Sequence, residues 1–450
     1  MTSVPISRRS ALVAAISSPM WLAACGGGGG GDSGGSGGDT IIRAINLTTD
    51  LPSADLYVGD VKQFSALATD AITNNITLVA NTYSVNVKAA GDSTALFTGS
   101  YSLSKDQKYT TVIWGRKSSL RVSTIGESED SANVTAGNSR IRVFNATVDL
   151  GAVDVYITPL PVNPNDPPTP SRSALASGTL AGYVDFGIGA YSVLVTGAGD
   201  PFDVRLSIPA ITVTDKQYYT LVLTQAGIGG VLLNGTLIAQ QAASTAFKNN
   251  KARVRLAASV AGGALVSVTL NGAATPTFAN YRSPTARGSG DYVLVDAGDI
   301  AVTATANGTA FGAGTNTFAV GQDYTLLAWG AANAPQLALL TDDNRPPANT
   351  AFAKIRLVNG LANSGLATIL LNASQTPSQT KDVEPGHASA YANLTASGIA
   401  MIQALSNQQS DPLFTLSTTN NISLLVPQGV YTLFLVDGGS APAGRLTKDR

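Results

Sequence analysis

The chain has 450 residues, and its 28 Lys and Arg against 29 Asp and Glu give a formal net charge of -1. This length exceeds one ordinary domain of roughly 100–200 residues, so several cores or one repeated core are expected. The near-neutral charge gives no electrostatic footprint for nucleic acid, and one His with one Cys supplies no zinc cluster, haem ligand pair or other cofactor site.

The first 25 residues have the parts of an export signal. Arg8 and Arg9 form a short basic region, and a largely apolar stretch over residues 11–24 leads to Cys25. The stretch is shorter than the roughly 20 residues that a helix needs to cross a bilayer core. The run Leu22-Ala23-Ala24-Cys25 resembles the lipobox of bacterial lipoproteins. This resemblance implies a signal peptide over residues 1–24 and lipid attachment to the thiol of Cys25.

The export route stays open between two alternatives. Ser7-Arg8-Arg9 resembles a twin-arginine signal in part, but Ser10 and Ala11 follow where that family has a large apolar residue, so Sec export is equally compatible. Gly26 rather than Asp follows the cysteine. By analogy with lipoprotein sorting this favours the outer membrane of a Gram-negative cell.

Residues 25–39 contain, after the cysteine, only Gly, Ser and Asp. Such a segment has nothing apolar to bury, and it predicts a disordered tether. The string Gly31-Asp32-Ser33-Gly34-Gly35 also matches the nucleophile region of trypsin-like proteases. That chemistry needs a positioned base, and the one histidine, His387, falls in a predicted turn, so we reject a protease.

Four segments after the tether open alike. Each places an arginine in an apolar run, and a second aligned position follows twelve residues later. The arginines are Arg43, Arg142, Arg255 and Arg356, and the second positions are Asp55, Asp154, Ser267 and Thr368. A Tyr-Thr pair begins a late apolar run in each unit, at Tyr109, Tyr219, Tyr324 and Tyr431. We therefore expect repeat one at 40–132, repeat two at 139–243, repeat three at 252–344 and repeat four at 353–450.

The pattern inside each unit is typical of β-strands. Segments such as 153–157, 191–195 and 204–208 alternate or are rich in β-branched and aromatic residues, and glycine- or proline-rich breaks separate them. No long stretch has helical periodicity. The sequence thus predicts an all-β chain of four tandem antiparallel immunoglobulin-like β-sandwich domains.

Unit two carries Ile141-Arg142-Val143-Phe144-Asn145, Val153-Asp154-Val155-Tyr156-Ile157 and Tyr219-Thr220-Leu221-Val222. It resembles the bacterial domain of unknown function 4397, and unit one is a close second. Units three and four keep the arginine and the Tyr-Thr pair but lack the early Asp and Tyr. The resemblance implies an exported β-sandwich, often in tandem, with no established activity.

Four charged residues are candidates for structural ion pairs. Arg43 with Asp55, and Arg142 with Asp154, are expected on adjacent strands where the charges would meet across the ladder. The alternative is a binding site in each unit, which Ser267 and Thr368 weaken because they replace the acid in later units.

Trp114 and Trp329 occupy equivalent places at the end of the Tyr-Thr strand. They would either pack in the core or stack on sugars, and we favour packing. Two acidic clusters, Glu127-Ser128-Glu129-Asp130 and Asp342-Asp343-Asn344, precede the next unit. They suit either calcium between domains or solvated linker, and we favour linker; no metal site is predicted.

These features favour a non-catalytic protein, exported and lipid-anchored in the cell envelope. The membrane is its expected partner through Cys25, and an envelope glycan or protein is the further candidate. The alternative is a glycan-binding surface or periplasmic protein. A hydrolase comes third, because no two carboxylates are placed together by the sequence.

Overall fold

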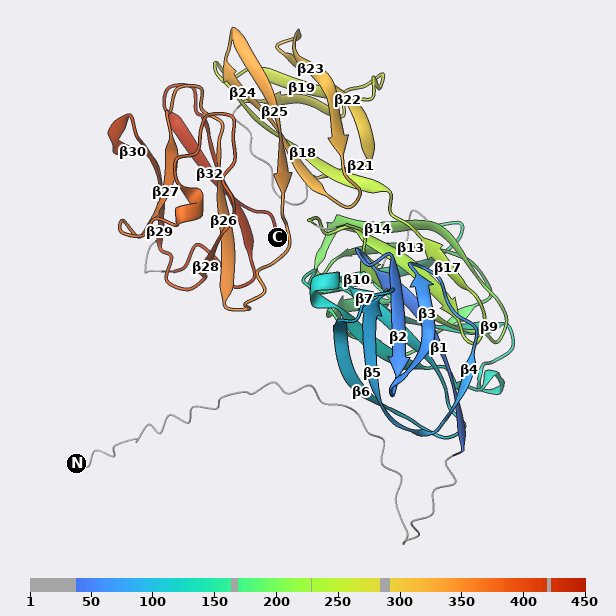
Figure 1. Cartoon of the computed structure of the whole chain (residues 1–450). Coiled ribbons are helices and arrows are strands. Elements are labelled where there is room, and N and C mark those ends of the chain that lie inside the picture. The colour runs from blue at the N-terminus through green and yellow to red at the C-terminus, as the bar shows by residue number, and fades with distance from the viewer. Residues whose placement is uncertain (1–37, 163–168, 228, 284–291, 419–421) are drawn as a thin grey trace, which may run out of the picture. The chain divides into compact units, whose positions relative to one another are not determined.

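The computed structural model describes residues 38–162, 169–227, 229–283, 292–418 and 422–450. Residues 38–450 form one compact unit (Figure 1). The predictions about the export signal, Cys25 and nearly all of the tether lie outside the described residues. In the part that is described, the chain is all β, with only short 3₁₀ turns such as η1 (Lys117–Ser119) and no α-helix.

Repeat one forms two sheets, with strand orders β4-β1-β7-β8 and β3-β2-β5-β6. Its strands are β1 (Asp39–Thr48), β2 (Ser53–Val58), β3 (Val61–Ala68), β4 (Ile76–Val79), β5 (Asn81–Ala89), β6 (Ala95–Leu103), β7 (Lys108–Gly115) and β8 (Arg121–Gly126).

Repeat two also forms two sheets, β12-β9-β15-β16-β17 and β11-β10-β13-β14. Its strands are β9 (Asn138–Asn145), β10 (Val153–Pro159), β11 (Arg172–Leu175), β12 (Val184–Gly187), β13 (Gly189–Gly197), β14 (Asp200–Val213), β15 (Tyr218–Gln225), β16 (Leu233–Ala239) and β17 (Ser244–Phe247). The last strand, β17, lies beyond residue 243, where repeat two was expected to end.

The second half of the chain follows the same plan, with sheets β21-β18-β24-β25 and β20-β19-β22-β23 in repeat three, and β28-β26-β31-β32 and β27-β29-β30 in repeat four. The strands of repeat three are β18 (Lys251–Val260), β19 (Leu265–Leu270), β20 (Phe278–Arg282), β21 (Val293–Asp296), β22 (Gly298–Ala306), β23 (Thr309–Phe318), β24 (Asp323–Ala331) and β25 (Ala334–Asp342). Those of repeat four are β26 (Phe352–Asn359), β27 (Ala367–Leu371), β28 (Ala392–Thr395), β29 (Met401–Ser406), β30 (Gln409–Ser417), β31 (Val430–Asp437) and β32 (Pro442–Lys448).

One pair of strands in each repeat is parallel, contrary to the antiparallel prediction. The first strand runs parallel to the Tyr-Thr strand, as β1 does to β7, β9 to β15, β18 to β24 and β26 to β31. A parallel pair cannot be closed by a short turn, so the whole repeat intervenes between the two strands. We call the sheet that contains this pair, and with it the repeated arginine, the arginine sheet.

The two sheets of each repeat share one hydrophobic core. In repeat one, Ile42 and Ile113 of the arginine sheet cluster with Leu56 and Val87 of the second sheet. Equivalent clusters hold repeats two, three and four. Strands of the second sheet alternate buried and exposed residues, as β22 does, because only one of their faces meets this core.

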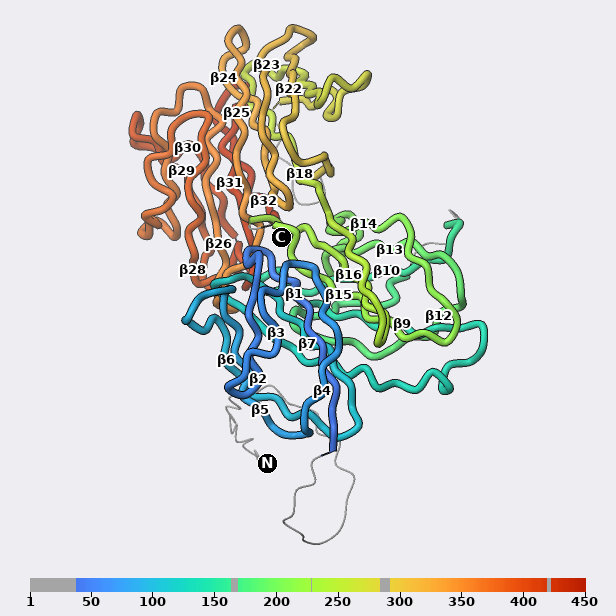
Figure 2. Tube along the Cα trace, turned by 45° about the vertical axis from the view of Figure 1, so that its right-hand side comes forward, coloured from blue at the N-terminus to red at the C-terminus, as the bar shows by residue number. Residues whose placement is uncertain are grey.

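The central strands of the arginine sheets are buried on both faces. Every residue of β15 is buried. The arginine sheets of repeats one and two lie side by side (Figure 2). Their outer faces pack together through a cluster that contains Val112, Phe144 and Val222. Leu327, Val358 and Phe434 belong to the corresponding cluster between repeats three and four. The repeats therefore associate in two pairs, one with two and three with four.

The tyrosine of each Tyr-Thr pair ties its strand to the preceding turn. Its hydroxyl accepts the backbone N–H of the residue five positions earlier in all four repeats. The N–H···O distances are 3.2 Å at Tyr109, 3.2 Å at Tyr219, 2.9 Å at Tyr324 and 2.9 Å at Tyr431. Such a bond fixes the corner where the chain enters the central strand.

Candidate functional site

The repeated arginine is joined to the repeated threonine in every unit. The parallel register places Arg43 opposite Thr110, and the equivalent pairs are Arg142 with Thr220, Arg255 with Thr325 and Arg356 with Thr432. In each pair the arginine Nε donates to the threonine Oγ1, at 2.8, 3.0, 2.9 and 3.1 Å respectively. All eight side chains belong to buried residues. The arginine and the threonine are both repeated in the sequence, but no sequence pattern indicates that they bind each other.

The predicted pairing of Arg43 with Asp55, and of Arg142 with Asp154, is wrong. The two members of each pair lie on different sheets, because β1 and β9 belong to arginine sheets whereas β2 and β10 belong to the second sheets. Asp55 instead accepts a bond from Lys62 at 2.7 Å. Asp154 accepts the backbone N–H groups of Ala174 at 2.7 Å and Gly199 at 2.9 Å. Both aspartates brace loops of the second sheet.

The acids that neutralise the arginines come from the end of the arginine sheet. Arg43 Nη2 lies 2.8 Å from Glu127. In repeats three and four the shortest ion pairs cross between the repeats, because Arg255 pairs with Asp449 at 2.5 Å and Arg356 pairs with Asp342. Arg255 also lies 3.5 Å from Asp342 of its own repeat. Glu127 and Asp342 are thus buried ion-pair partners of the arginines. For these two residues, both the calcium site and the solvated linker suggested by the sequence are wrong.

Repeats one and two also exchange contacts, although with carbonyl groups. Arg43 donates to the carbonyl oxygens of Ala239 and Ala242 in repeat two. Arg142 donates to the carbonyl oxygen of Gly126 in the segment that ends repeat one, at 2.7 Å. The position that holds the acid in the other repeats is Gln240 in repeat two. These bonds connect the two arginine sheets beside their shared cluster.

Burial and neighbouring charge shift the ionisation of this network. Burial raises the pKa of Asp342, but Arg356 and Arg255 outweigh it and the pKa lies below its usual value. Burial lowers the pKa of Lys354 to about 8, although Asp343 lies 3.2 Å away. The ring of Tyr391 lies below the Lys354 ammonium, 4.6 Å from nitrogen to ring centroid.

The tryptophans pack between paired repeats. Trp114 is 6% exposed, meets Phe144 edge to face with centroids 5.6 Å apart, and donates from Nε1 to Ser123 at 3.0 Å. Trp329 is half-buried at the equivalent cluster of repeats three and four, against Gly386. Trp114 therefore has no face for a sugar, and packing accounts for both rings better than stacking does.

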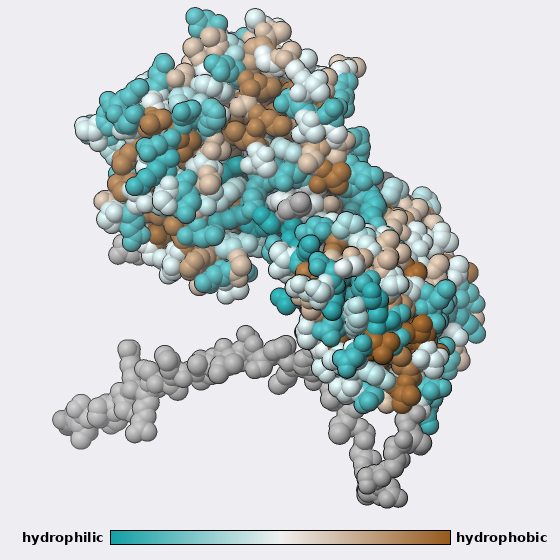
Figure 3. Space-filling view, in the orientation of Figure 1, coloured by the Kyte–Doolittle hydropathy of each residue, from teal (hydrophilic) through white to brown (hydrophobic). Residues whose placement is uncertain are grey.

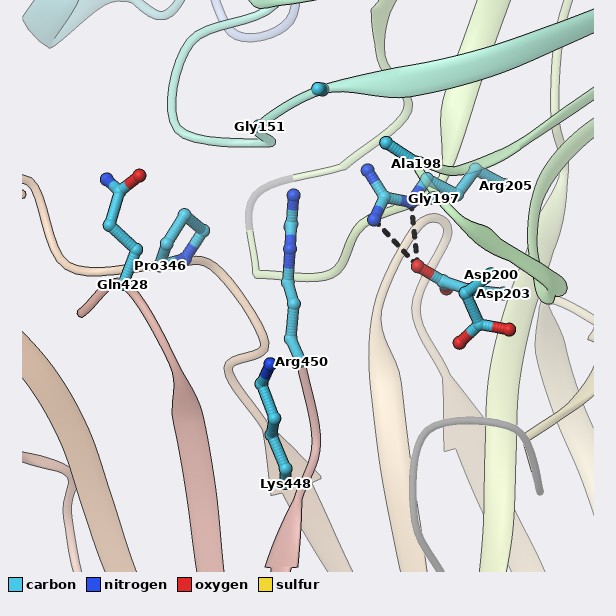
Figure 4. Close-up of a pocket in the computed structure, with 11 residues that line it drawn as sticks. Gly151, Gly197, Ala198, Asp200, Asp203, Arg205, Pro346, Gln428, Lys448 and Arg450 are labelled. Atoms are coloured by element: carbon cyan, nitrogen blue, oxygen red, sulfur yellow. Dashed lines mark hydrogen bonds and ion pairs between the residues drawn. The ribbon is translucent and has the colours of Figure 1, made fainter. Parts of the chain in front are cut away.

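A cavity of about 430 Å³ holds a buried guanidinium nitrogen of Arg450 that has no acceptor (Figure 4). Glycine and alanine of the β13–β14 turn line it together with Asp203 and Arg205 of β14, and residues near the end of repeat four complete it. Figure 4 shows Arg450 extending into the space between the Gly151 loop and Arg205. Arg205 is fully engaged by Asp203 and the carbonyl of Leu150. This site was not predicted from the sequence, because its residues are far apart in the chain and come together only in the fold.

The family model described as Domain of unknown function (DUF4397) matches residues 40–156 and 252–364, together just over half of the chain. The chain belongs to this family. The first match spans repeat one, β9 and part of β10, and the second spans repeat three and β26, so repeats one and three lie inside the matched DUF4397 ranges. Most of repeat two lies outside them, although repeat two was expected to resemble the family most closely.

Solved structures give only distant similarity to this DUF4397 protein. One is described as alpha-glucan binding by a streptococcal virulence factor, with 13% identity, a TM-score of 0.16, and coverage of 41% of this chain and 93% of that chain. Another is a fimbrial assembly protein from Parabacteroides distasonis, with 12% identity, a TM-score of 0.19, and coverage of 47% and 97%. No curated protein matches the chain.

Within the described residues of this DUF4397 protein, no three His, Cys, Asp or Glu side chains gather as metal ligands. None of the described helices is both long enough and apolar enough to span a membrane. The face drawn in Figure 3 mixes hydrophilic and hydrophobic residues.

Proposed function

We propose that this DUF4397 protein is a non-catalytic envelope lipoprotein, anchored through Cys25, whose four immunoglobulin-like sandwich domains act in pairs as a structural or adhesive array. The observation that supports the proposal is that the buried charged side chains bind one another inside the protein. The repeated arginines, their threonines and their acids bind one another across sheets and between repeats. Groups held in this way stabilise a scaffold rather than turn over a substrate.

The paired arrangement supports a display role. A buried apolar cluster and reciprocal polar bonds hold each pair, so two repeats move as one body. The tether between Cys25 and Asp39 would give the array reach from the membrane, roughly 20 Å for a random coil of that length. Adhesion requires in addition a surface that recognises a partner in the envelope, either protein or glycan.

A glycan partner is the second candidate, and the cavity beside Arg450 favours it rather than the tryptophans. Trp114 is enclosed by Phe144 and the strands around it. The cavity, by contrast, has polar side chains at its wall and a volume within the range of small-ligand sites.

Cys25→Ser tests the anchor. We expect the variant to lack acylation and to leave the membrane fraction, because one thiol carries the whole lipid attachment. Membrane fractionation and mass spectrometry of the intact chain measure both effects, with Ser36→Cys alone as a control for an added thiol in the tether. A Cys25→Ser chain that stays in the membrane fraction contradicts the anchor.

A further inference from the structure

The guanidinium of Arg450 has no hydrogen-bond acceptor or carboxylate within bonding distance among the described residues, although the charged groups around it are paired. No described residue gives it a hydrogen bond or an ion pair, and its Nη1 is buried and without an acceptor. An arginine side chain stays charged in proteins, and a buried donor without an acceptor costs free energy. The Arg450 guanidinium therefore lacks an acceptor, although carboxylates stand elsewhere on the cavity wall.

The charges that act on Arg450 leave a surplus of positive charge. Asp203 bridges two arginines, lying 2.6 Å from Arg205 and 2.5 Å from Arg253. Arg253 also binds Asp323 at 2.7 Å. The two carboxylates are thus used by Arg205 and Arg253, and Arg450 brings a third guanidinium to the group. Burial, and then repulsion from Arg205, hold the pKa of Arg450 well below its usual value.

The cavity offers room and further polar groups. Gly197 and Ala198 present backbone without bulk, and Gly151 lies directly against the Arg450 guanidinium (Figure 4). The side chains of Gln428 and Lys448 line the same space. Asp200 adds a carboxylate at the wall that accepts only the N–H of Phe202.

We propose that this cavity binds a monoanionic carboxylated sugar, with its carboxylate on the Arg450 guanidinium and its hydroxyls on Asp200 and Gln428. A guanidinium matches the two oxygens of a carboxylate in a planar fork. The cavity of about 430 Å³ exceeds what a bare inorganic anion fills and suits a single sugar ring. A single excess positive charge calls for one negative charge. The inference rests on the proposed binding role and names the ligand class for it.

Isothermal titration calorimetry of the purified full-length chain in detergent tests the site with three probes: glucuronate, glucose and inorganic phosphate. We expect glucuronate to bind and glucose to bind at least about tenfold more weakly, because glucose lacks the charge that meets Arg450. Phosphate binding without glucuronate binding would contradict the carboxylate assignment, and binding of neither would remove the site.

Arg450→Gln should weaken glucuronate binding about tenfold or more, whereas Arg445→Gln, at an exposed position on β32, should leave it unchanged. The melting temperature of ligand-free Arg450→Gln should not fall, because the charge removed has no partner. A lower melting temperature, or unchanged binding, would contradict the proposal. A chain that leaves the membrane on Cys25→Ser and captures envelope material, yet ignores glucuronate, would contradict this site alone.

Discussion

At the residue scale, the repeated arginines find their partners inside the protein. Each repeated arginine binds a threonine and, in addition, carbonyl groups or an acid. Several also lie against an aromatic ring, as Arg142 does 4.5 Å from the ring centroid of Tyr183. Burial raises the pKa of that tyrosine to about 12. Removing one partner of such a buried pair leaves the other charge exposed to an apolar environment, which is costly.

We expect the free energy of unfolding to rise with pH because of Lys354. Its pKa falls from 10.5 to about 8 on folding, because burial outweighs the attraction of Asp343. Between these pH values the unfolded chain holds a proton that the folded chain lacks, so stability rises with pH across the window, by up to about 3 kcal/mol. Lys354→Met should abolish this rise, since Asp343 keeps Arg345 as its partner.

Denaturant unfolding of wild type and Lys354→Met at pH 7.5 and pH 10 measures the effect as a difference between the two proteins. Lys381→Met, at an exposed position, is the matched control and should follow the wild type. Parallel pH profiles for wild type and Lys354→Met would show that the buried ammonium does not titrate in this window.

At the element scale, the central strands of the arginine sheets hold both a core and an interface. Strand β7 directs Ile113 toward the core of repeat one and Trp114 toward repeat two. This alternation explains why the Tyr-Thr strands have continuous apolar runs rather than an alternating pattern, since both faces are covered.

Trp114→Ala should destabilise the paired repeats by about 3–5 kcal/mol, because it leaves a cavity in a buried cluster and removes the edge contact with Phe144. Trp329→Ala is the comparison and should cost less, since that ring is half-buried. Guanidinium unfolding followed by circular dichroism measures both. Unchanged stability together with lost binding to glycans would restore the stacking hypothesis for Trp114.

The sequence predicted the strands and the repeats, but not which strands pair. Arginine and aspartate at a twelve-residue spacing suggested neighbours on a hairpin, whereas the chain crosses from one sheet to the other between β1 and β2. The true partner of Arg43, Thr110, is 67 residues away. Hydrophobic periodicity indicates which face of a strand is buried. It does not indicate that two strands far apart in the sequence pair in parallel, or that an arginine binds an acid from another repeat.

At the scale of the whole molecule, the pair of repeats is the smallest unit in which the outer face of the arginine sheet is covered. Repeat one alone would expose Leu47, Val112 and Trp114. The DUF4397 matches agree with this, since each runs past its first repeat into the strands of the second.

A fragment of residues 38–249 should therefore unfold in one cooperative transition, whereas residues 38–128 should melt at a lower temperature and self-associate through the uncovered face. Scanning calorimetry and sedimentation velocity distinguish the two fragments. A monomeric 38–128 fragment with the same melting temperature would show that the repeats fold independently.

The exchanged ion pairs of repeats three and four also constrain how such chains can diverge. Arg255 depends on Asp449 and Arg356 on Asp342, so each repeat holds the counterion of its neighbour. A gene rearrangement that moved a single repeat would break the pairs Arg255–Asp449 and Arg356–Asp342, whereas duplication of the two repeats together keeps both pairs. Compensating substitutions should accordingly be sought between adjacent repeats rather than within one.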